Sequence, residues 1–165
     1  MTIGVGDRLP EAKFFVMGSE GPQPKTTSDV FSGRKVALFA VPGAYTPTCH
    51  KQHMPGFLER LEEIKAKGVD AVCCTAVNDV FVMDQWGKDT GAAGQIELLS
   101  DGAAEFAKAT GLDIDLSGFG LGVRSKRYAM LVDDGVVKVL NIDEAPPQHD
   151  KSSAATLCSA MGNMI

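Results

Sequence analysis

Residues 35–42 (KVALFAVP) form an almost uninterrupted apolar run, and this run restricts the fold more than any other feature of the chain. A continuous apolar segment of this length predicts a strand that is covered on both faces of its sheet. Residues 69–77 (VDAVCCTAV) repeat the pattern, and residues 95–101 (QIELLSD) give a shorter version. Because such strands need helices on both sides, the sequence predicts an α/β fold.

Helical patterns lie between these strands. After the first strand, apolar residues recur at helical spacing until a basic turn and a glycine at Lys67 and Gly68; they are Met54, Phe57, Leu58, Leu61 and Ile64. Asn78 and Asp79 predict the start of a short helix that runs through Trp86. Residues 103–111 predict another helix, which ends at a glycine.

The C-terminal third predicts a hairpin followed by a helix. Asp133, Asp134 and Gly135 separate two apolar runs, and Asp-Gly in this setting is a strong hairpin signal. Ser152 and Ser153 begin the last helix, whose apolar stripe contains Ala154, Leu157, Cys158, Met161 and Ile165. The predicted order β-α-β-α-β-α-β-β-α indicates a thioredoxin-like α/β fold, a mixed sheet flanked by helices. With 165 residues and no linker, we expect a single domain over residues 1–165.

Charge and cysteine content narrow the class of function. The net charge of −5 argues against a nucleic-acid partner, and no apolar run approaches the roughly 18 residues of a membrane span. The N-terminal residues show no basic region followed by an apolar one, so no secretory signal is visible. The four cysteines form no C-x-x-C pair or dense framework, which favours a reducing compartment. We expect a cytoplasmic protein, with an organelle address removed from the sequence as the alternative.

Cys49 lies where a helix is predicted to begin, directly after the first buried strand. Thr46 suits the N-cap and Pro47 the first helical position, which puts Cys49 in the first turn. Unpaired N–H groups and the helix dipole stabilise an anion there, and a thiolate is such an anion. Pro55 should kink this helix near Lys51.

Three chemistries compete for this cysteine, and a metal site is a further alternative. Thiol–disulfide exchange normally uses a second cysteine two or three positions away, but Thr46 stands there. A cysteine hydrolase needs a histidine base, and His53 lies one helical turn on, without a dedicated third member. Zinc binding by Cys49, His50 and His53 lacks a fourth ligand. Solvated or capping roles fit both histidines better than either ligand role.

Attack on a peroxide O–O bond is the third chemistry. It requires a thiolate, a donor that orients the peroxide, a cation that balances the developing charge, and a pocket that excludes water. Thr46 lies within one turn of Cys49, and Pro42 adds apolar shielding without an N–H group. The cation has to come from elsewhere in the chain.

The segment Pro42-x3-Thr46-x2-Cys49 resembles the signature of the peroxiredoxins. The wider run VPGAYTPTCHKQHMPGF, with GVDAVCCTAVNDVFVMDQWGK and GLGVRSKRYAMLVDDGVVKVLNID, is similar to the peroxiredoxin-5 or plant type II branch over nearly the whole chain. The resemblance implies a thioredoxin fold and a thiol peroxidase that reduces hydrogen peroxide and alkyl hydroperoxides. It implies that Cys49 is the peroxidatic cysteine, with Pro42, Thr46 and Arg127 as its catalytic partners. Arg124 is the alternative arginine.

The resemblance also bears on how the enzyme is recycled. The sulfenic acid formed at Cys49 must be reduced before more peroxide oxidises it further. Cys74 occupies a place where members of the branch often carry a second cysteine, and Cys158 lies near the resolving position of animal members. Core packing explains Cys73, Cys74 and Cys158 equally well, so an external thiol is the simplest resolver. Similarity to plant and bacterial members favours glutaredoxin with glutathione, then thioredoxin, without a cofactor or metal.

Two further expectations concern assembly and class. Members of the branch commonly form homodimers through loops around the active site, here near residues 42–45 and 117–125 (SGFGLGVRS), where Phe119 and Leu121 look exposed. No membrane or nucleic-acid partner is expected. The alternative class of function is a thioredoxin-like interaction or redox-sensor module that keeps the fold without turnover.

Overall fold

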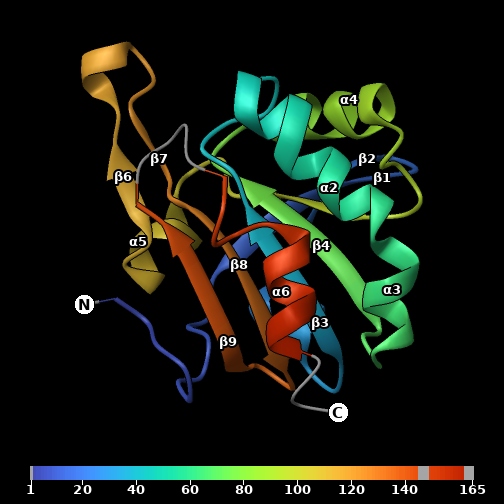
Figure 1. Ribbon diagram of the computed structural model, residues 1–165. Coiled ribbons are helices and arrows are strands. Elements are labelled where there is room, and N and C mark those ends of the chain that lie inside the picture. Colours follow the sequence, from blue (N-terminus) through green and yellow to red (C-terminus); the bar gives the residue numbers. More distant parts are fainter. Residues whose placement is uncertain (1, 145–148, 162–165) are drawn as a thin grey trace.

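The computed structural model describes residues 2–144 and 149–161. A seven-stranded sheet forms its centre, in the order β2-β1-β5-β4-β3-β8-β9 (Figure 1). The strands are β1 (Lys13–Gly18), β2 (Gly21–Thr26), β3 (Lys35–Ala40), β4 (Ala71–Ala76), β5 (Glu97–Ser100), β8 (Arg127–Asp133) and β9 (Val136–Asp143). β3, β4 and β5 are parallel, whereas β8 joins β3 in the antiparallel direction. The predicted mixed sheet is confirmed.

Helices cover both faces of this sheet. They are α1 (Thr27–Phe31), α2 (Met54–Glu59), α3 (Leu61–Ala66), α4 (Val80–Thr90), α5 (Glu105–Thr110) and α6 (Ala154–Met161). Side chains of α2, α3, α4 and α6 share one buried cluster, and those of α1 and α5 share the other. The helix through Trp86 was predicted too short, because α4 continues to Thr90 and ends at Gly91, whose φ of 80° suits glycine.

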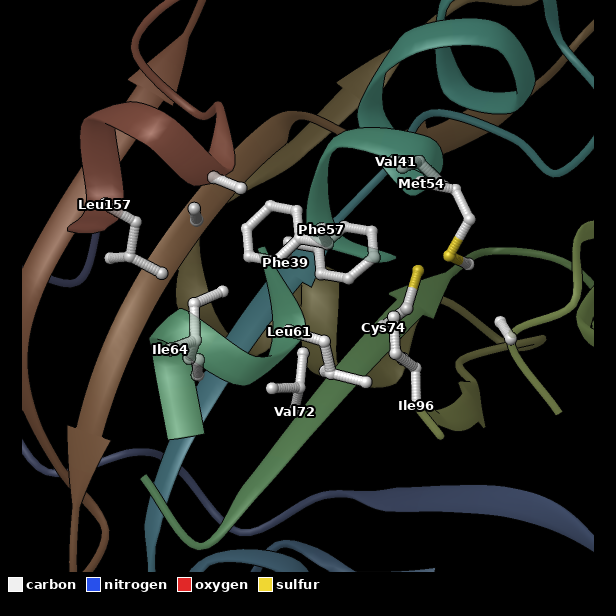
Figure 2. Close-up of a cluster of buried hydrophobic side chains, with 14 of the residues drawn as sticks. Phe39, Val41, Met54, Phe57, Leu61, Ile64, Val72, Cys74, Ile96 and Leu157 are labelled. Atoms are coloured by element: carbon white, nitrogen blue, oxygen red, sulfur yellow. The ribbon is translucent and has the colours of Figure 1, made fainter. Parts of the chain in front are cut away.

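The two apolar strands lie at the centre of the sheet, as their sequence predicted. Because side chains alternate along a strand, Phe39 and Cys74 face one layer of helices while Leu38 and Cys73 face the other. In the first layer, the rings of Phe39 and Phe57 stack with centroids 4.0 Å apart (Figure 2). This packing fixes α2, and so the segment that precedes it, against the end of β3.

The predicted hairpin is confirmed between β8 and β9. Asp134 and Gly135 form its turn with φ values of 48° and 81°, which is the left-handed region that Asp-Gly tolerates. Between Leu131 and Val132 the register shifts by one residue, because β9 has an extra residue, Lys138, at this point. The hairpin brings the first residue of β8 to the same sheet edge at which β3 ends.

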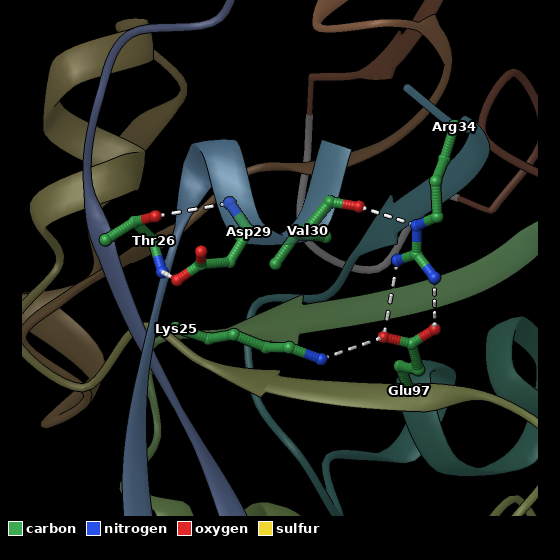
Figure 3. Close-up of polar contacts among 6 residues, drawn as sticks. All are labelled: Lys25, Thr26, Asp29, Val30, Arg34 and Glu97. Atoms are coloured by element: carbon green, nitrogen blue, oxygen red, sulfur yellow. Dashed lines mark hydrogen bonds and ion pairs between the residues drawn. The ribbon is translucent and has the colours of Figure 1, made fainter. Parts of the chain in front are cut away.

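An N-terminal hairpin and α1 were absent from the sequence prediction. β2 reads GPQPKT, and two prolines argue against a central strand; it is an edge strand, where proline is tolerated. Thr26 and Asp29 then form a capping box that begins α1. Glu97 of β5 forms ion pairs with Lys25 of β2 and with Arg34 (Figure 3). These pairs tie the edge strand β2 to the inner part of the sheet.

The irregular glycine-rich link forms an arm that projects from the sheet. It contains β6 (Asp113–Asp115), a 3₁₀ turn (Ser117–Phe119) and β7 (Val123–Ser125), two short strands that the sequence did not predict (Figure 1). Phe119 at its tip is 81% exposed, and Leu121 is half-buried.

None of the helices in the described part of the chain has the length and apolar character needed to span a membrane.

We expect Phe106→Ala to lower the free energy of unfolding by about 3–5 kcal/mol, because it leaves a cavity in the layer under α5. Phe106 is fully buried and lies 4.9 Å from the ring of Phe14. Phe81→Ala is the matched control: this ring is 62% exposed, so the change should stay within about 0.5 kcal/mol. Urea unfolding measures both, and equal losses in the two variants contradict the assignment of this layer as core.

Candidate active site

Cys49 lies in the first turn of the helix that follows β3, and its side chain is fully buried. The helix begins at Pro47, as predicted, and the carbonyl of Thr46 accepts the first helical hydrogen bond from the N–H of His50 at 2.9 Å. The Thr46 side chain differs from the predicted N-cap: its hydroxyl donates to the carbonyl of Gly43 at 2.6 Å. With its hydrogen engaged there, the oxygen of Thr46 is left as an acceptor toward the site.

A π-helical turn over Cys49–His53 stands where Pro55 was predicted to kink the helix. The N–H of Met54 donates to the carbonyl of Cys49, five residues back. Because Pro55 has no N–H, the carbonyl of Lys51 lacks its usual α-helical donor. The wider turn accommodates this loss, and such turns are frequent at functional sites.

Arg127 reaches Cys49 from β8, the strand next to β3. It is the first residue of β8, beside the end of β3, where Ala40 pairs with Tyr128. Its Nη2 donates to the Cys49 sulfur at 3.0 Å, and the side chain is 1% exposed. Arg124, the alternative from sequence, does not make this contact; its Nη1 donates to the carbonyl of Pro42 at 3.3 Å. The structure thus brings Arg127 to the sulfur and Arg124 to the neighbouring loop.

His53 is the residue of this site that sequence reasoning missed. The solvated or capping role favoured for it is wrong, because the ring is fully buried. Its Nδ1 lies 3.0 Å from Nη1 of Arg127, and its Nε2 lies 2.9 Å from the carbonyl of Ser152. Since arginine only donates, Nδ1 is the acceptor and Nε2 carries the hydrogen. The only sequence signal for this residue was its place one helical turn after Cys49.

Burial lowers the pKa of His53 well below its usual value, and the charge of Arg127 lowers it further. The ring is therefore neutral at neutral pH, which is the state that lets Nδ1 accept from the guanidinium. Both nitrogens are engaged with other groups, so His53 is not arranged as the base of a cysteine hydrolase.

Asp143 orients the segment whose Ser152 carbonyl accepts the hydrogen bond from His53. Its carboxylate accepts hydrogen bonds from the N–H and hydroxyl of Ser152 at 2.9 and 2.6 Å and from the N–H groups of Asp150 and Lys151 at 3.0 Å each. Burial alone raises the pKa of this carboxyl, but these donors outweigh it and lower the pKa to about 2. The ionised carboxylate therefore anchors the segment before α6, and that segment anchors His53.

His149 packs beside this chain of contacts. Its ring centroid lies 4.9 Å from that of His53, and burial, followed by the charge of Arg127, lowers its pKa. A second neutral ring therefore packs against His53, the ring that contacts the guanidinium.

The entrance to the site is an apolar pocket of about 240 Å³. Its lining residues come from the loop after β3 and from the projecting arm; they are Pro42, Thr46, Pro47, Thr48, Leu116, Leu121 and Arg127. Arg127, Thr46 and Thr48 are the polar residues of its lining. Pro42 forms part of the apolar wall that its position in the motif predicted.

His50 and Tyr45 bind the outer side of this turn to α4. His50 Nδ1 accepts from the indole N–H of Trp86 at 3.0 Å, and its ring stacks on that of Tyr45. The Tyr45 hydroxyl donates to Asp89 at 2.6 Å, and this bond raises the pKa of Tyr45 to about 12. The Nδ1 atoms of His50 and His53 thus both accept from nitrogen donors, which leaves neither atom available to a zinc ion at Cys49.

The other three cysteines are free and buried. Cys74 lies on the same side of β4 as Cys49, and burial, followed by the proximity of Cys49, raises its pKa. Burial also raises the pKa of Cys73 on the opposite side. Cys158 in α6 has its pKa raised to about 11 by burial and by a hydrogen bond with Glu63. These thiols fit their predicted place in the core and are weak nucleophiles in this conformation.

The chain is similar in sequence and in fold to proteins of one family. The family model named Redoxin matches residues 4–158. The chain is 51% identical over 148 residues to the chloroplastic peroxiredoxin-2E-2 of Oryza sativa subsp. japonica, covering 87% of this chain and 66% of that protein. It is 44% identical to peroxiredoxin-2B of Arabidopsis thaliana, covering 96% and 98% of the two chains. The crystal structure of reduced Prx3 from Vibrio vulnificus in complex with hydrogen peroxide aligns with a TM-score of 0.92 at 45% identity, over 97% and 99% of the two chains.

We expect His53→Leu to slow alkylation of Cys49 by iodoacetamide about five-fold at neutral pH, because Arg127 loses one of the contacts that aim it at the sulfur. His53→Gln is the matched variant, since its amide can accept from the guanidinium and donate to the Ser152 carbonyl. The rate in His53→Gln should lie close to that of the unmodified protein. Equal slowing in both variants means that His53 only fills space.

We expect Asp143→Asn to lower the free energy of unfolding by roughly 2 kcal/mol at neutral pH. Because the pKa of Asp143 is lowered from 3.8 to about 2, its stabilisation is fully present above 3.8 and is lost as pH falls toward 2. The difference between the two proteins should therefore shrink over this range in urea titrations. Glu20→Gln, at an exposed position, controls for the loss of one negative charge. A difference that stays constant with pH contradicts the anchoring role.

Proposed function

The chain belongs to the Redoxin family and, within it, to the peroxiredoxins of the plant type II branch with their thioredoxin-like fold, and from this membership we propose that it reduces hydrogen peroxide and alkyl hydroperoxides through Cys49. The observation that carries the proposal is the buried contact of 3.0 Å between Arg127 and the Cys49 sulfur. A permanently charged guanidinium in a site that excludes water stabilises an anionic sulfur far more than it does in bulk water.

The first step is attack of the Cys49 thiolate on the nearer oxygen of the peroxide. A sulfur–oxygen bond forms as the O–O bond breaks, and the departing oxygen leaves as an alkoxide or hydroxide that takes up a proton. The sulfur is oxidised to a sulfenic acid, and the peroxide is reduced to an alcohol or water.

The contacts around Cys49 suit this step. Arg127 has donors for both the sulfur and a peroxide oxygen, so it stabilises charge as it moves from one to the other. The Thr46 oxygen, whose own hydrogen is engaged with Gly43, is an acceptor for the peroxide O–H. Pro42 contributes apolar wall and no competing N–H. These are the roles we propose for the four residues.

The apolar pocket favours substrates that carry an organic group. Its volume of about 240 Å³ has room for more than hydrogen peroxide, and Arg127, which contacts the sulfur, belongs to its lining. An alkyl group gains free energy when it leaves water for such an apolar wall. A related structure is described as a complex with hydrogen peroxide, which is the smallest substrate in the proposed class.

We propose that an external thiol completes the cycle. One thiol attacks the sulfenic sulfur and releases water, and a second thiol reduces the mixed disulfide and restores Cys49. The raised pKa values of Cys74 and Cys158 support an outside resolver, because a protonated buried thiol attacks slowly. Glutaredoxin with glutathione is the reductant we favour, with thioredoxin second, and no cofactor takes part.

The setting of the reaction is part of the proposal. Four free cysteines suit a reducing compartment, and we favour the cytoplasm. Two relatives are named chloroplastic, which makes the plastid the alternative. We also propose a homodimer formed through the loop at Tyr45 and the arm that carries the exposed Phe119 ring.

We expect Cys49→Ser to lose all peroxidase turnover, because a hydroxyl at this position does not provide the anionic nucleophile. Cys158→Ser is the matched control and should keep turnover when glutaredoxin with glutathione supplies the electrons. Peroxide consumption in steady state measures both, and the same assay with thioredoxin decides between the two reductants.

A second measurement separates the peroxidase from a non-catalytic module. After one equivalent of hydroperoxide, intact mass with a sulfenic-acid trap should show a single adduct at Cys49. Turnover that persists in Cys49→Ser, or a Cys49 that stays unoxidised in the unmodified protein, overturns the assignment.

A further inference from the structure

The apolar pocket has walls from two parts of the chain that lie far apart in the sequence. One wall is the loop between β3 and the Cys49 helix, with Pro42, Thr46 and Pro47. The other wall belongs to the arm, which contributes Leu116 and Leu121. The width of the pocket therefore depends on what holds the arm against the loop.

Arg124 of β7 makes that connection. Its Nε donates to the carbonyl of Leu121 at 2.8 Å, and its Nη1 donates to the carbonyl of Pro42 at 3.3 Å. One planar guanidinium thus bonds a backbone carbonyl of each wall. A planar group with fixed donor directions sets the separation of two acceptors more narrowly than a flexible side chain does.

Gly43 shows how closely the guanidinium sits on the loop. A Cβ atom at this position lies 2.7 Å from Nη1 of Arg124 and 3.1 Å from the Thr46 methyl carbon. A side chain here therefore has to displace the guanidinium. Glycine at position 43 is what lets Arg124 reach the Pro42 carbonyl.

The outer end of the arm is exposed. Residues 117–120 at its tip are all exposed, and Phe119 is 81% exposed. Leu116 is the arm residue that is buried at the pocket, with 5% exposure. Segments with exposed backbone open at low free-energy cost, so the hydrogen bond from Arg124 to the Pro42 carbonyl helps to set the position of the arm.

We propose that Arg124 is a positioning residue that sets the width of the pocket and thereby the selectivity of the enzyme for organic hydroperoxides over hydrogen peroxide. This inference rests on the proposed function. Hydrogen peroxide has no apolar part and needs only the groups around the sulfur. An aromatic hydroperoxide has to place its ring against Leu116 and Leu121, so its binding depends on the position of the arm.

The test compares kcat/KM for cumene hydroperoxide with kcat/KM for hydrogen peroxide. In Arg124→Ala the ratio of the two values should fall about ten-fold, mainly through KM for cumene hydroperoxide, which corresponds to the loss of roughly one well-placed apolar contact. In Arg124→Lys the ratio should fall by a similar factor, because lysine keeps the positive charge but does not hold two carbonyls in the fixed geometry of a guanidinium. Arg60→Ala, in an exposed pair with Glu63 on α3, is the control for loss of an arginine and should keep the ratio.

Gly43→Ala tests the same link without altering Arg124. The added Cβ displaces the guanidinium of Arg124. The ratio of the two kcat/KM values should therefore fall when Gly43→Ala is made alone. It should change far less when Gly43→Ala is combined with Arg124→Ala. The inference is wrong if Arg124→Ala leaves the ratio unchanged or lowers kcat/KM equally for both peroxides. It is also wrong if Arg124→Lys keeps the full ratio. Absence of all peroxidase activity in the unmodified protein refutes the proposed function instead.

Discussion

The contact between Arg127 and the Cys49 sulfur is the interaction on which the site depends. A guanidinium that is 1% exposed is costly to bury unless it is paired, so the charge must be balanced by groups around it. The sulfur of Cys49 and the ring of His53 lie 3.0 Å from two different nitrogens of that group. His53 is neutral and accepts a hydrogen bond from one of these nitrogens, while the Cys49 sulfur accepts from the other.

The sequence predicted the local features of this site and missed its long-range ones. Thr46, Pro47 and Cys49 lie within one turn, so helix capping and the apolar run before them place the cysteine without a structure. His53 lies 74 residues from Arg127 and 99 residues from Ser152 along the chain. Hydrophobic periodicity carries no information about such pairs. Arg127 itself was chosen through family resemblance, because spacing alone did not separate it from Arg124.

The elements of the fold, likewise, were predicted well where their sequence pattern is strong and poorly where it is weak. The central strands β3 and β4 are continuous apolar runs and were predicted close to their bounds. The hairpin β1–β2 was missed because Pro22 and Pro24 argue against a strand, and only its place at the sheet edge makes those prolines acceptable. The arm was read as irregular because its strands are three residues each and its glycines obscure any alternation.

Two arginines three residues apart illustrate how one short segment serves reactivity and selectivity separately. Arg124 belongs to β7 in the small sheet, and Arg127 begins β8 in the central sheet, so the chain passes from one sheet to the other between them. The guanidinium on the rigid central sheet meets the sulfur, where a small displacement changes the charge balance of the reaction. The guanidinium on the projecting arm donates to the backbone carbonyls of Leu121 and Pro42. Under the proposed function, changes in the arm should therefore alter which hydroperoxide fits while the guanidinium at the sulfur stays in place.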